Sequence, residues 1–130
     1  MSGAGAGDGR LDGSSDGRSD RARAWPATAE QLMRSRFTAF RDGDAAWLLA
    51  SWHPDTRPAQ LDLADGPRWR GLQIVDTVAG GVDDAEGIVE FRATYRDGDE
   101  LGVLHERSRF SRVDGRWRYL DGDVRETTLG

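Results

Sequence analysis

The hydrophobic period of this chain changes once, at about residue 68, and this change restricts the fold more than any other feature. Before it, apolar residues recur at the spacing of an α-helix; after it, apolar and polar residues alternate as in a β-strand. Helices followed by strands that short turns connect are typical of an α+β domain, with helices packed on an antiparallel sheet. The sequence therefore predicts one such domain over residues 25–130.

The first helix is predicted from residue 29 to about residue 41. Thr28 and Gln31 have the spacing of a capping box, and Gly43 breaks the helix. Its apolar residues fall on one arc at 100° per residue: Ala29, Leu32, Met33, Phe37 and Phe40. Arg36 lies inside this arc and is thus expected among apolar neighbours.

A second helix is predicted from Asp44, its N-cap, to Pro54, which ends it. The expected buried stripe consists of Ala45, Leu48, Leu49 and Trp52. His53 lies at the C-terminus of this helix, where the macrodipole favours a cationic side chain.

Strands are predicted at about residues 68–78, 87–96, 100–113 and 116–121. The Asp-Gly pairs at 97–98 and 114–115 are typical of two-residue hairpin turns. A bulge near Gly71 would bring Trp69 to the core side of the first strand.

These turns predict the register, and the register divides the residues between two faces. Phe91 should pair with Leu104, Val89 with Glu106, Phe110 with Tyr119 and Ser108 with Asp121. The core face should carry Val89, Phe91, Ala93, Tyr95, Leu104, Phe110, Trp117 and Tyr119, together with the polar Glu106 and Ser108. The outer face should carry Glu90, Arg92, His105, Arg107, Arg109 and Arg118.

Composition excludes several functional classes. The chain has no Cys and only two His, which excludes disulfides and thiolate metal sites; we therefore expect neither a metal site, zinc included, nor a cofactor. The formal net charge of −5 argues against a general nucleic-acid-binding surface. No apolar run is long enough for a membrane span, so we expect no membrane partner and a cytoplasmic location.

Residues 1–24 form a Gly/Asp/Arg-rich segment that lacks the apolar side chains needed for a core. Such a segment cannot offset its ordering entropy, and we expect a disordered tail. An Arg/Gly-type nucleic-acid-binding tail is the alternative, but its four Asp and four Arg leave it without net charge.

Four segments of the chain are similar to the YchJ-type family of uncharacterised bacterial proteins: LMRSRFTAF (32–40), WHPDTRP (52–58), WRGLQI (69–74) and LHERSRF…DGRWRYLDG (104–122). The resemblance implies a nuclear transport factor 2-like (cystatin-like) fold, a curved sheet wrapped around helices to form a cone. Family members commonly carry a Cys-rich SEC-C motif, thought to bind zinc, before the first helix. Here that region is free of Cys, so the resemblance does not imply a zinc-dependent role for this chain.

The first hypothesis is a non-enzymatic binding or self-association module that could form a homodimer through the outer sheet face. In this interpretation Arg36 neutralises the buried Glu106 in a structural ion pair, and Ser108 and Asp121 complete the hydrogen bonds.

The alternative is a small-molecule-binding lyase or isomerase, as in SnoaL-like relatives of the fold. Glu106 and Asp121 would then form an acid–base pair, with Tyr95 and Tyr119 as hydrogen-bond donors. His53 would lie at the rim of the cavity. The candidate binding residues are Arg36, Trp52, Tyr95, Ser108 and Tyr119.

Overall fold

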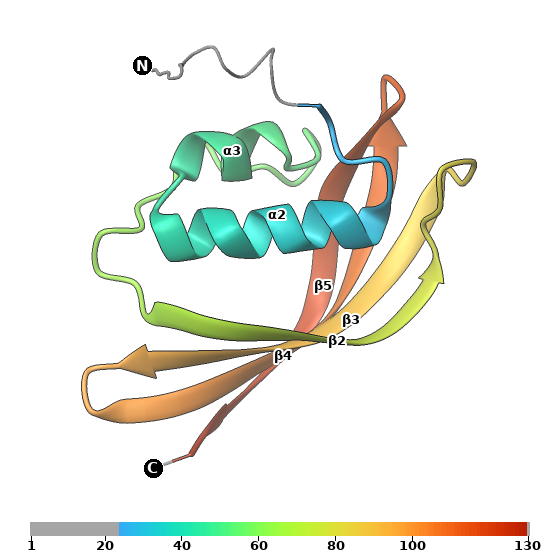
Figure 1. Cartoon of the computed structure of the whole chain (residues 1–130). Helices are drawn as coiled ribbons and strands as arrows, with labels where there is room; N and C mark the ends of the chain where they lie inside the picture. The colour runs from blue at the N-terminus through green and yellow to red at the C-terminus, as the bar shows by residue number, and fades with distance from the viewer. Residues whose placement is uncertain (1–23, 130) are drawn as a thin grey trace.

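The computed structural model describes residues 24–129 as helices packed on one face of an antiparallel sheet (Figure 1). Its elements are α2 (Ala29–Asp42), α3 (Ala45–Ala50), β2 (Arg68–Ala79), β3 (Glu86–Asp97), β4 (Glu100–Val113) and β5 (Arg116–Thr128). The predicted tail, residues 1–24, lies outside the described residues except for Ala24. None of the described helices is long and apolar enough to cross a membrane.

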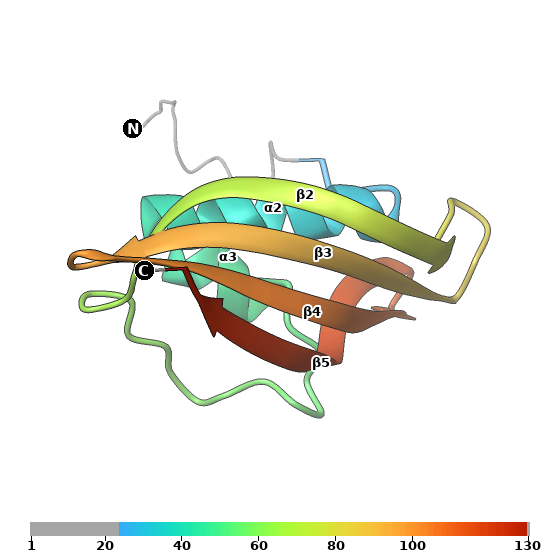
Figure 2. The same cartoon turned by 90° about the horizontal axis from the view of Figure 1, so that it is seen from below.

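The sheet has the strand order β2-β3-β4-β5, and every neighbouring pair is antiparallel. The strands twist and bend around α2, and both helices lie on the same side (Figures 1 and 2). No described helix or loop covers the middle of the opposite face, which is turned toward the viewer in Figure 2. This uncovered surface is called the outer face below.

Helix α2 begins and ends as its sequence predicts. The Thr28 hydroxyl accepts a hydrogen bond from the Gln31 N–H, and Gly43 ends the helix with φ of 76°. A left-handed residue at this position favours glycine because it has no Cβ. The buried residues of α2 include Arg36, which confirms that this cation lies on the apolar side of the helix.

Helix α3 ends at Ala50, earlier than predicted. Instead of continuing the helix, residues 51–53 bond to the edge of β5: the Tyr119 N–H donates to the Ser51 carbonyl, and the His53 N–H donates to the Tyr119 carbonyl. This pairing satisfies backbone groups that a helix end leaves free. The shorter helix buries Trp47, which the predicted stripe omitted and which packs against Trp25 at a ring distance of 4.8 Å.

The core lies between the helices and the inner face of the sheet. Its fully buried members include Leu32, Leu48, Val89, Phe110 and Trp117, and Trp69 packs against them at the edge. A register shift between Trp69 and Gly71 confirms the bulge predicted there. The assignment of core and outer residues in β3 and β4 is also confirmed.

The register differs from the prediction in two places. The β3–β4 turn lies at Gly98–Asp99, where only the first residue has positive φ, so Phe91 pairs with Glu106 instead of Leu104. This shift of two residues keeps every side chain on its predicted face. In β5, Leu120 is an extra residue between the pairs Phe110–Tyr119 and Arg109–Asp121, and this bulge changes the face of each residue that follows.

Candidate functional site: the two faces of the sheet

Arg36 connects the two helices with the sheet. Its side chain is only 2% exposed, and its Nη1 donates to the Leu48 carbonyl at 2.9 Å and to the Ser51 hydroxyl at 2.7 Å. The guanidinium carbon lies 5.0 Å from the Trp52 ring centre and 4.6 Å from that of Tyr119. Burial lowers the Arg36 pKa to about 10, although Tyr119 and Glu106 oppose this shift. Arg36 therefore remains a cation at neutral pH.

Glu106 is the buried anion of the inner face. Its Oε2 accepts hydrogen bonds from the Ser108 hydroxyl and the Tyr119 hydroxyl, both at 2.8 Å. No ion pair within 4 Å joins it to Arg36 in the described part of the chain, so the predicted direct ion pair is wrong. Tyr119 connects the two charges: its ring faces the guanidinium and its hydroxyl binds the carboxylate. We call this arrangement the Arg36–Tyr119–Glu106 bridge.

Asp121 does not join this bridge. The Leu120 bulge places Gly122 opposite Ser108 and turns Asp121 toward the outer face, where it bonds to the Arg109 Nε. The predicted acid–base pair of Glu106 and Asp121 is therefore wrong, because the two carboxylates lie on opposite faces of the sheet.

Gly122 provides the space that Glu106 occupies. A Cβ atom at this position would lie 2.2 Å from the Glu106 Oε2, far inside van der Waals contact. We expect Gly122→Ala to displace the carboxylate and to lower the free energy of unfolding by about 1–3 kcal/mol, as overpacking commonly does. Urea denaturation measures this loss. Gly66→Ala is the matched control, because its Cβ would meet nothing closer than 3.5 Å. Equal stability of the two variants would contradict the tight packing around Glu106.

The two tyrosines do not converge on one point. The Tyr119 hydroxyl binds Glu106, whereas the Tyr95 hydroxyl donates to Glu126 at 3.0 Å and its ring packs on Trp69. They therefore do not form the predicted pair of donors for a developing oxyanion.

Burial and the Glu106 carboxylate raise the pKa of Tyr119, and the hydrogen bond to Glu126 raises that of Tyr95. A raised pKa means that the tyrosine stays protonated in the folded protein at a pH where it ionises in the unfolded chain. The stability that this tyrosine contributes is therefore complete below about pH 10 and is lost as the pH rises further. We expect Tyr119 to ionise only as the protein unfolds. Alkaline titration of phenolate absorbance, compared with Tyr119→Phe, tests this. Ionisation of Tyr119 near pH 10 in the folded protein would contradict the assignment.

His53 and Trp52 lie near the bridge without completing a catalytic group. The His53 Nδ1 accepts the Asp55 N–H at 3.0 Å, which occupies that nitrogen in a local turn. The Trp52 ring packs edge-on against Tyr119, and its Nε1 is buried with no hydrogen-bond partner among the described residues. The predicted binding residues Arg36, Trp52, Ser108 and Tyr119 are thus brought together, whereas Tyr95 lies apart.

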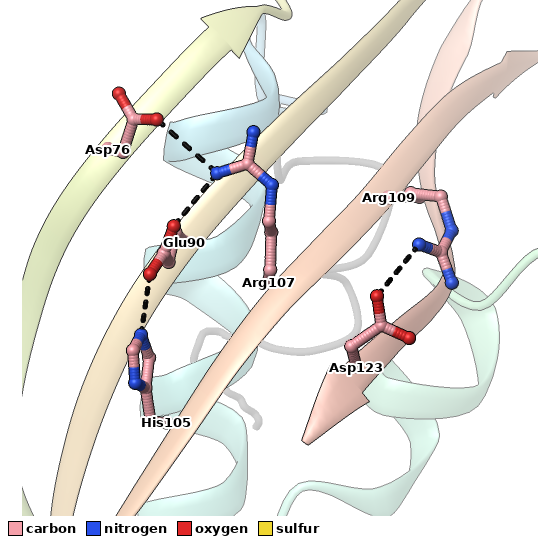
Figure 3. A network of polar contacts seen from close by, with 6 residues as sticks. All are labelled: Asp76, Glu90, His105, Arg107, Arg109 and Asp123. Atoms are coloured by element: carbon pink, nitrogen blue, oxygen red, sulfur yellow. Dashed lines mark hydrogen bonds and ion pairs between the residues drawn. The ribbon is translucent and has the colours of Figure 1, made fainter. Parts of the chain in front are cut away.

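The outer face carries an ordered set of ion pairs across the strands (Figure 3). The Glu90 carboxylate of β3 contacts the His105 Nε2 at 2.6 Å and the Arg107 Nη1 at 2.8 Å. Arg107 also reaches Asp76 on β2, and Arg109 contacts Asp121 and Asp123 on β5. We call this set the outer ladder: Asp76, Glu90, His105, Arg107, Arg109, Asp121 and Asp123.

The ladder shifts the pKa values of Glu90, Arg107 and Arg109 in the direction that favours their charged forms. Hydrogen bonds from His105 and Arg107 lower the pKa of Glu90, and those to Glu90 and Asp76 raise that of Arg107. Each acid of the ladder thus contacts an arginine on another strand, Asp76 and Glu90 sharing Arg107, and Asp121 and Asp123 sharing Arg109.

An apolar depression of about 310 Å³ adjoins the outer ladder. It is lined by Val78, Ala79, Ile88 and Leu120, with Glu86, Arg109 and Ser111 among its polar neighbours. Val78 is 45% exposed. Sequence reasoning missed this depression, because only the bulge places Leu120 beside Val78 and Ile88.

The comparisons with known proteins match the same region of the chain as the helices and the sheet. The family model described as YchJ, middle NTF2-like domain, matches residues 28–122. UPF0225 protein SCO1677 of Streptomyces coelicolor is 59% identical over 96 residues, which are 74% of each chain. UPF0225 protein CE1570 of Corynebacterium efficiens is 52% identical over 99 residues, covering 76% of this chain and 75% of that one.

Two solved structures share the fold. RPA3114, a SEC-C motif containing protein from Rhodopseudomonas palustris, matches with a TM-score of 0.68 and 28% identity over 79% of this chain and 82% of that one. A SEC-C motif containing protein from Psychrobacter arcticus matches with a TM-score of 0.61 and 28% identity over 78% of this chain and 63% of that one. This chain contains no cysteine with which to form a Cys-rich motif.

Proposed function

Since the chain belongs to the YchJ family and matches its middle NTF2-like domain over residues 28–122, we propose that this domain works as a non-enzymatic self-association module. Its partner is a second copy of the same chain, and the contact surface is the outer face of the sheet. The observation that carries the proposal is the uncovered outer face, where an apolar depression adjoins charges that are already paired.

The inner face offers little support for acid–base chemistry. Glu106 is 8% exposed, and its carboxylate receives two hydroxyl donors. Asp121 points to the other side of the sheet and pairs with Arg109. Glu106 and Tyr119 are thus hydrogen-bonded to each other, and the sheet separates Asp121 from both. This arrangement favours an architectural role for the Arg36–Tyr119–Glu106 bridge.

The dimensions of the outer face suit a stable dimer. Its four strands contain 12 to 14 residues each. At about 3.3 Å per residue and about 4.8 Å per strand, the face measures about 40 Å by 19 Å, or about 750 Å². This area is close to the roughly 800 Å² that each partner contributes to an interface of standard size.

The charge on this face also suits a second copy. The whole chain has a formal net charge of −5, which would make two copies repel each other. The four carboxylates of the outer ladder share Arg107 and Arg109. Arg92 and Arg125, the residues opposite His105 on β3 and β5, add two cations to the same face, so two outer faces can approach without a large repulsion. The neighbouring apolar side chains supply a hydrophobic contribution to association.

Sedimentation velocity over a range of protein concentrations tests the proposal. We expect a reversible increase to about twice the mass of one chain, with no further assembly, because a twofold contact through one face is closed. A single monomeric species at every concentration would contradict the proposed self-association.

A further inference from the structure

A second charged surface lies at the edge of β5, where three arginines gather. Arg116 and Arg118 lie two residues apart on β5. Their guanidinium carbons lie 5.0 Å and 4.7 Å, respectively, from the centre of the Trp25 ring. Arg57 comes from the loop that packs against the same edge, and its Nη2 donates to the Trp52 carbonyl at 2.8 Å. We call these residues the arginine cluster.

The chain holds this cluster in place through several long-range contacts. The Trp25 Nε1 donates to the Trp117 carbonyl, and the Arg118 Nη1 donates to the Ala50 carbonyl at the end of α3. The Thr56 hydroxyl, next to Arg57, donates to the Leu120 carbonyl. Segments that are far apart in the sequence therefore fix the positions from which the three cations project.

The positive charge of the cluster is not neutralised by direct partners. Within residues 24–129, no carboxylate lies within 4 Å of the guanidinium groups of Arg57, Arg116 or Arg118. Arg118 also has a buried Nε with no hydrogen-bond partner there. Burial lowers the Arg118 pKa, and the charges of Arg57 and Arg116 lower it further, whereas Asp114 opposes the shift. The three arginines thus lie close enough for their charges to repel one another, and a bound anion would offset this unfavourable electrostatic energy.

We infer that the arginine cluster binds the phosphate group of a small-molecule ligand. Guanidinium groups match the geometry of phosphate and carboxylate oxygens. A carboxylate supplies only one negative charge against three cations, whereas a phosphate supplies up to about two, together with three acceptor oxygens. The site lies at the β5 edge, not among the ion pairs of the outer ladder, and it does not depend on dimer formation.

Calorimetric titration of the full chain with inorganic phosphate, pyrophosphate and a phosphate monoester tests this inference, with acetate at equal ionic strength as the reference. We expect both inorganic anions to bind more tightly than acetate, pyrophosphate most tightly. Arg116→Gln should weaken pyrophosphate binding about tenfold, because one charge-assisted contact is lost. The Arg116 side chain contacts the Trp25 ring but makes no hydrogen bond within residues 24–129, so this variant should fold normally, which circular dichroism checks. If the monoester binds more tightly than inorganic phosphate, the natural ligand is an organic phosphate; the reverse order indicates free phosphate.

Arg41→Gln is the matched control, because Arg41 is exposed on α2 and, among the residues that the structure describes, pairs only with its neighbour Asp42. It should bind pyrophosphate as the wild type does, whereas Arg57→Gln should weaken pyrophosphate binding as Arg116→Gln is expected to. Equal binding by the Arg116 and Arg41 variants, or no binding of any phosphate probe by the wild type, would overturn the inference. Binding of a single-stranded oligonucleotide without binding of pyrophosphate would also overturn it, in favour of a nucleic-acid surface.

Discussion

Replacing Arg36 with methionine should lower the free energy of unfolding by about 3 kcal/mol, within the range seen when one partner of a buried charged group is removed. Methionine can fill much of the space, but it cannot donate to the Leu48 carbonyl or the Ser51 hydroxyl. Glu106 would also remain buried without the nearby cation that attracts its carboxylate and that packs on the Tyr119 ring. The loss therefore combines missing hydrogen bonds with an uncompensated charge.

Urea denaturation of Arg36→Met and Arg34→Met measures this effect against a matched control. Arg34 lies on the same helix, but its side chain is 54% exposed and pairs with Glu30 on the surface. Its replacement should change the stability by less than about 1 kcal/mol. Similar losses in both variants would show that Arg36 makes no special contribution to the core.

A double-mutant cycle separates the bridge from simple packing. If Tyr119 couples Arg36 to Glu106, Arg36→Met should cost less in a Glu106→Gln background, where no buried anion remains. We expect a coupling energy of about 1 kcal/mol, within the usual range for residues of one polar network. A coupling energy of zero would mean that the two charges stabilise the fold independently.

Val78→Asp should dissociate the proposed dimer. Val78 lines the apolar depression of the outer face, and the second copy would cover a carboxylate placed there. Arg109, which borders the same depression, already pairs with Asp121 and Asp123. Burying a polar or charged group in this way costs several kcal/mol, so we expect the dissociation constant to rise on the order of a hundredfold. Sedimentation equilibrium measures the change directly.

Val82→Asp provides the control for this substitution. It makes the same chemical change at a residue that is 63% exposed in the β2–β3 connection, outside the depression. Thermal denaturation should show that both variants fold, because neither valine is buried in the core. If both variants dimerise as the wild type does, the depression is not part of the interface.

Much of the fold was predictable because local patterns and tertiary packing agree. The capping residue Thr28 and the left-handed Gly43 delimit α2, and the Asp-Gly pair at 114–115 forms the turn expected of it, with positive φ at both residues. Arg36 was recognised as an unusual residue on an apolar arc, and the structure places it in the core. These features depend on neighbours in the sequence.

The failed predictions concern how the strands pair, which the alternating pattern does not determine. An Asp-Gly pair also occurs at 97–98, but there the turn uses Gly98 as its first residue, which moves the register by two. The Leu120 bulge is not visible in an alternating pattern, and it alone separates Asp121 from Glu106. Gly122 suggests the end of a strand, yet β5 continues through it to Thr128, and the missing side chain leaves the space that the Glu106 carboxylate occupies.

The distance between two spin labels tests most directly whether the outer faces of two copies meet. Because the chain contains no cysteine, Arg92→Cys adds a single label near the middle of the outer face, and Arg34→Cys adds one on the exposed side of α2. Packed sheets lie about 10 Å apart, so the Arg92 labels of a dimer should lie within about 30 Å, closer than the Arg34 labels. Dipolar spectra that show no pair distance for Arg92, or a shorter distance for Arg34, would contradict the proposed function.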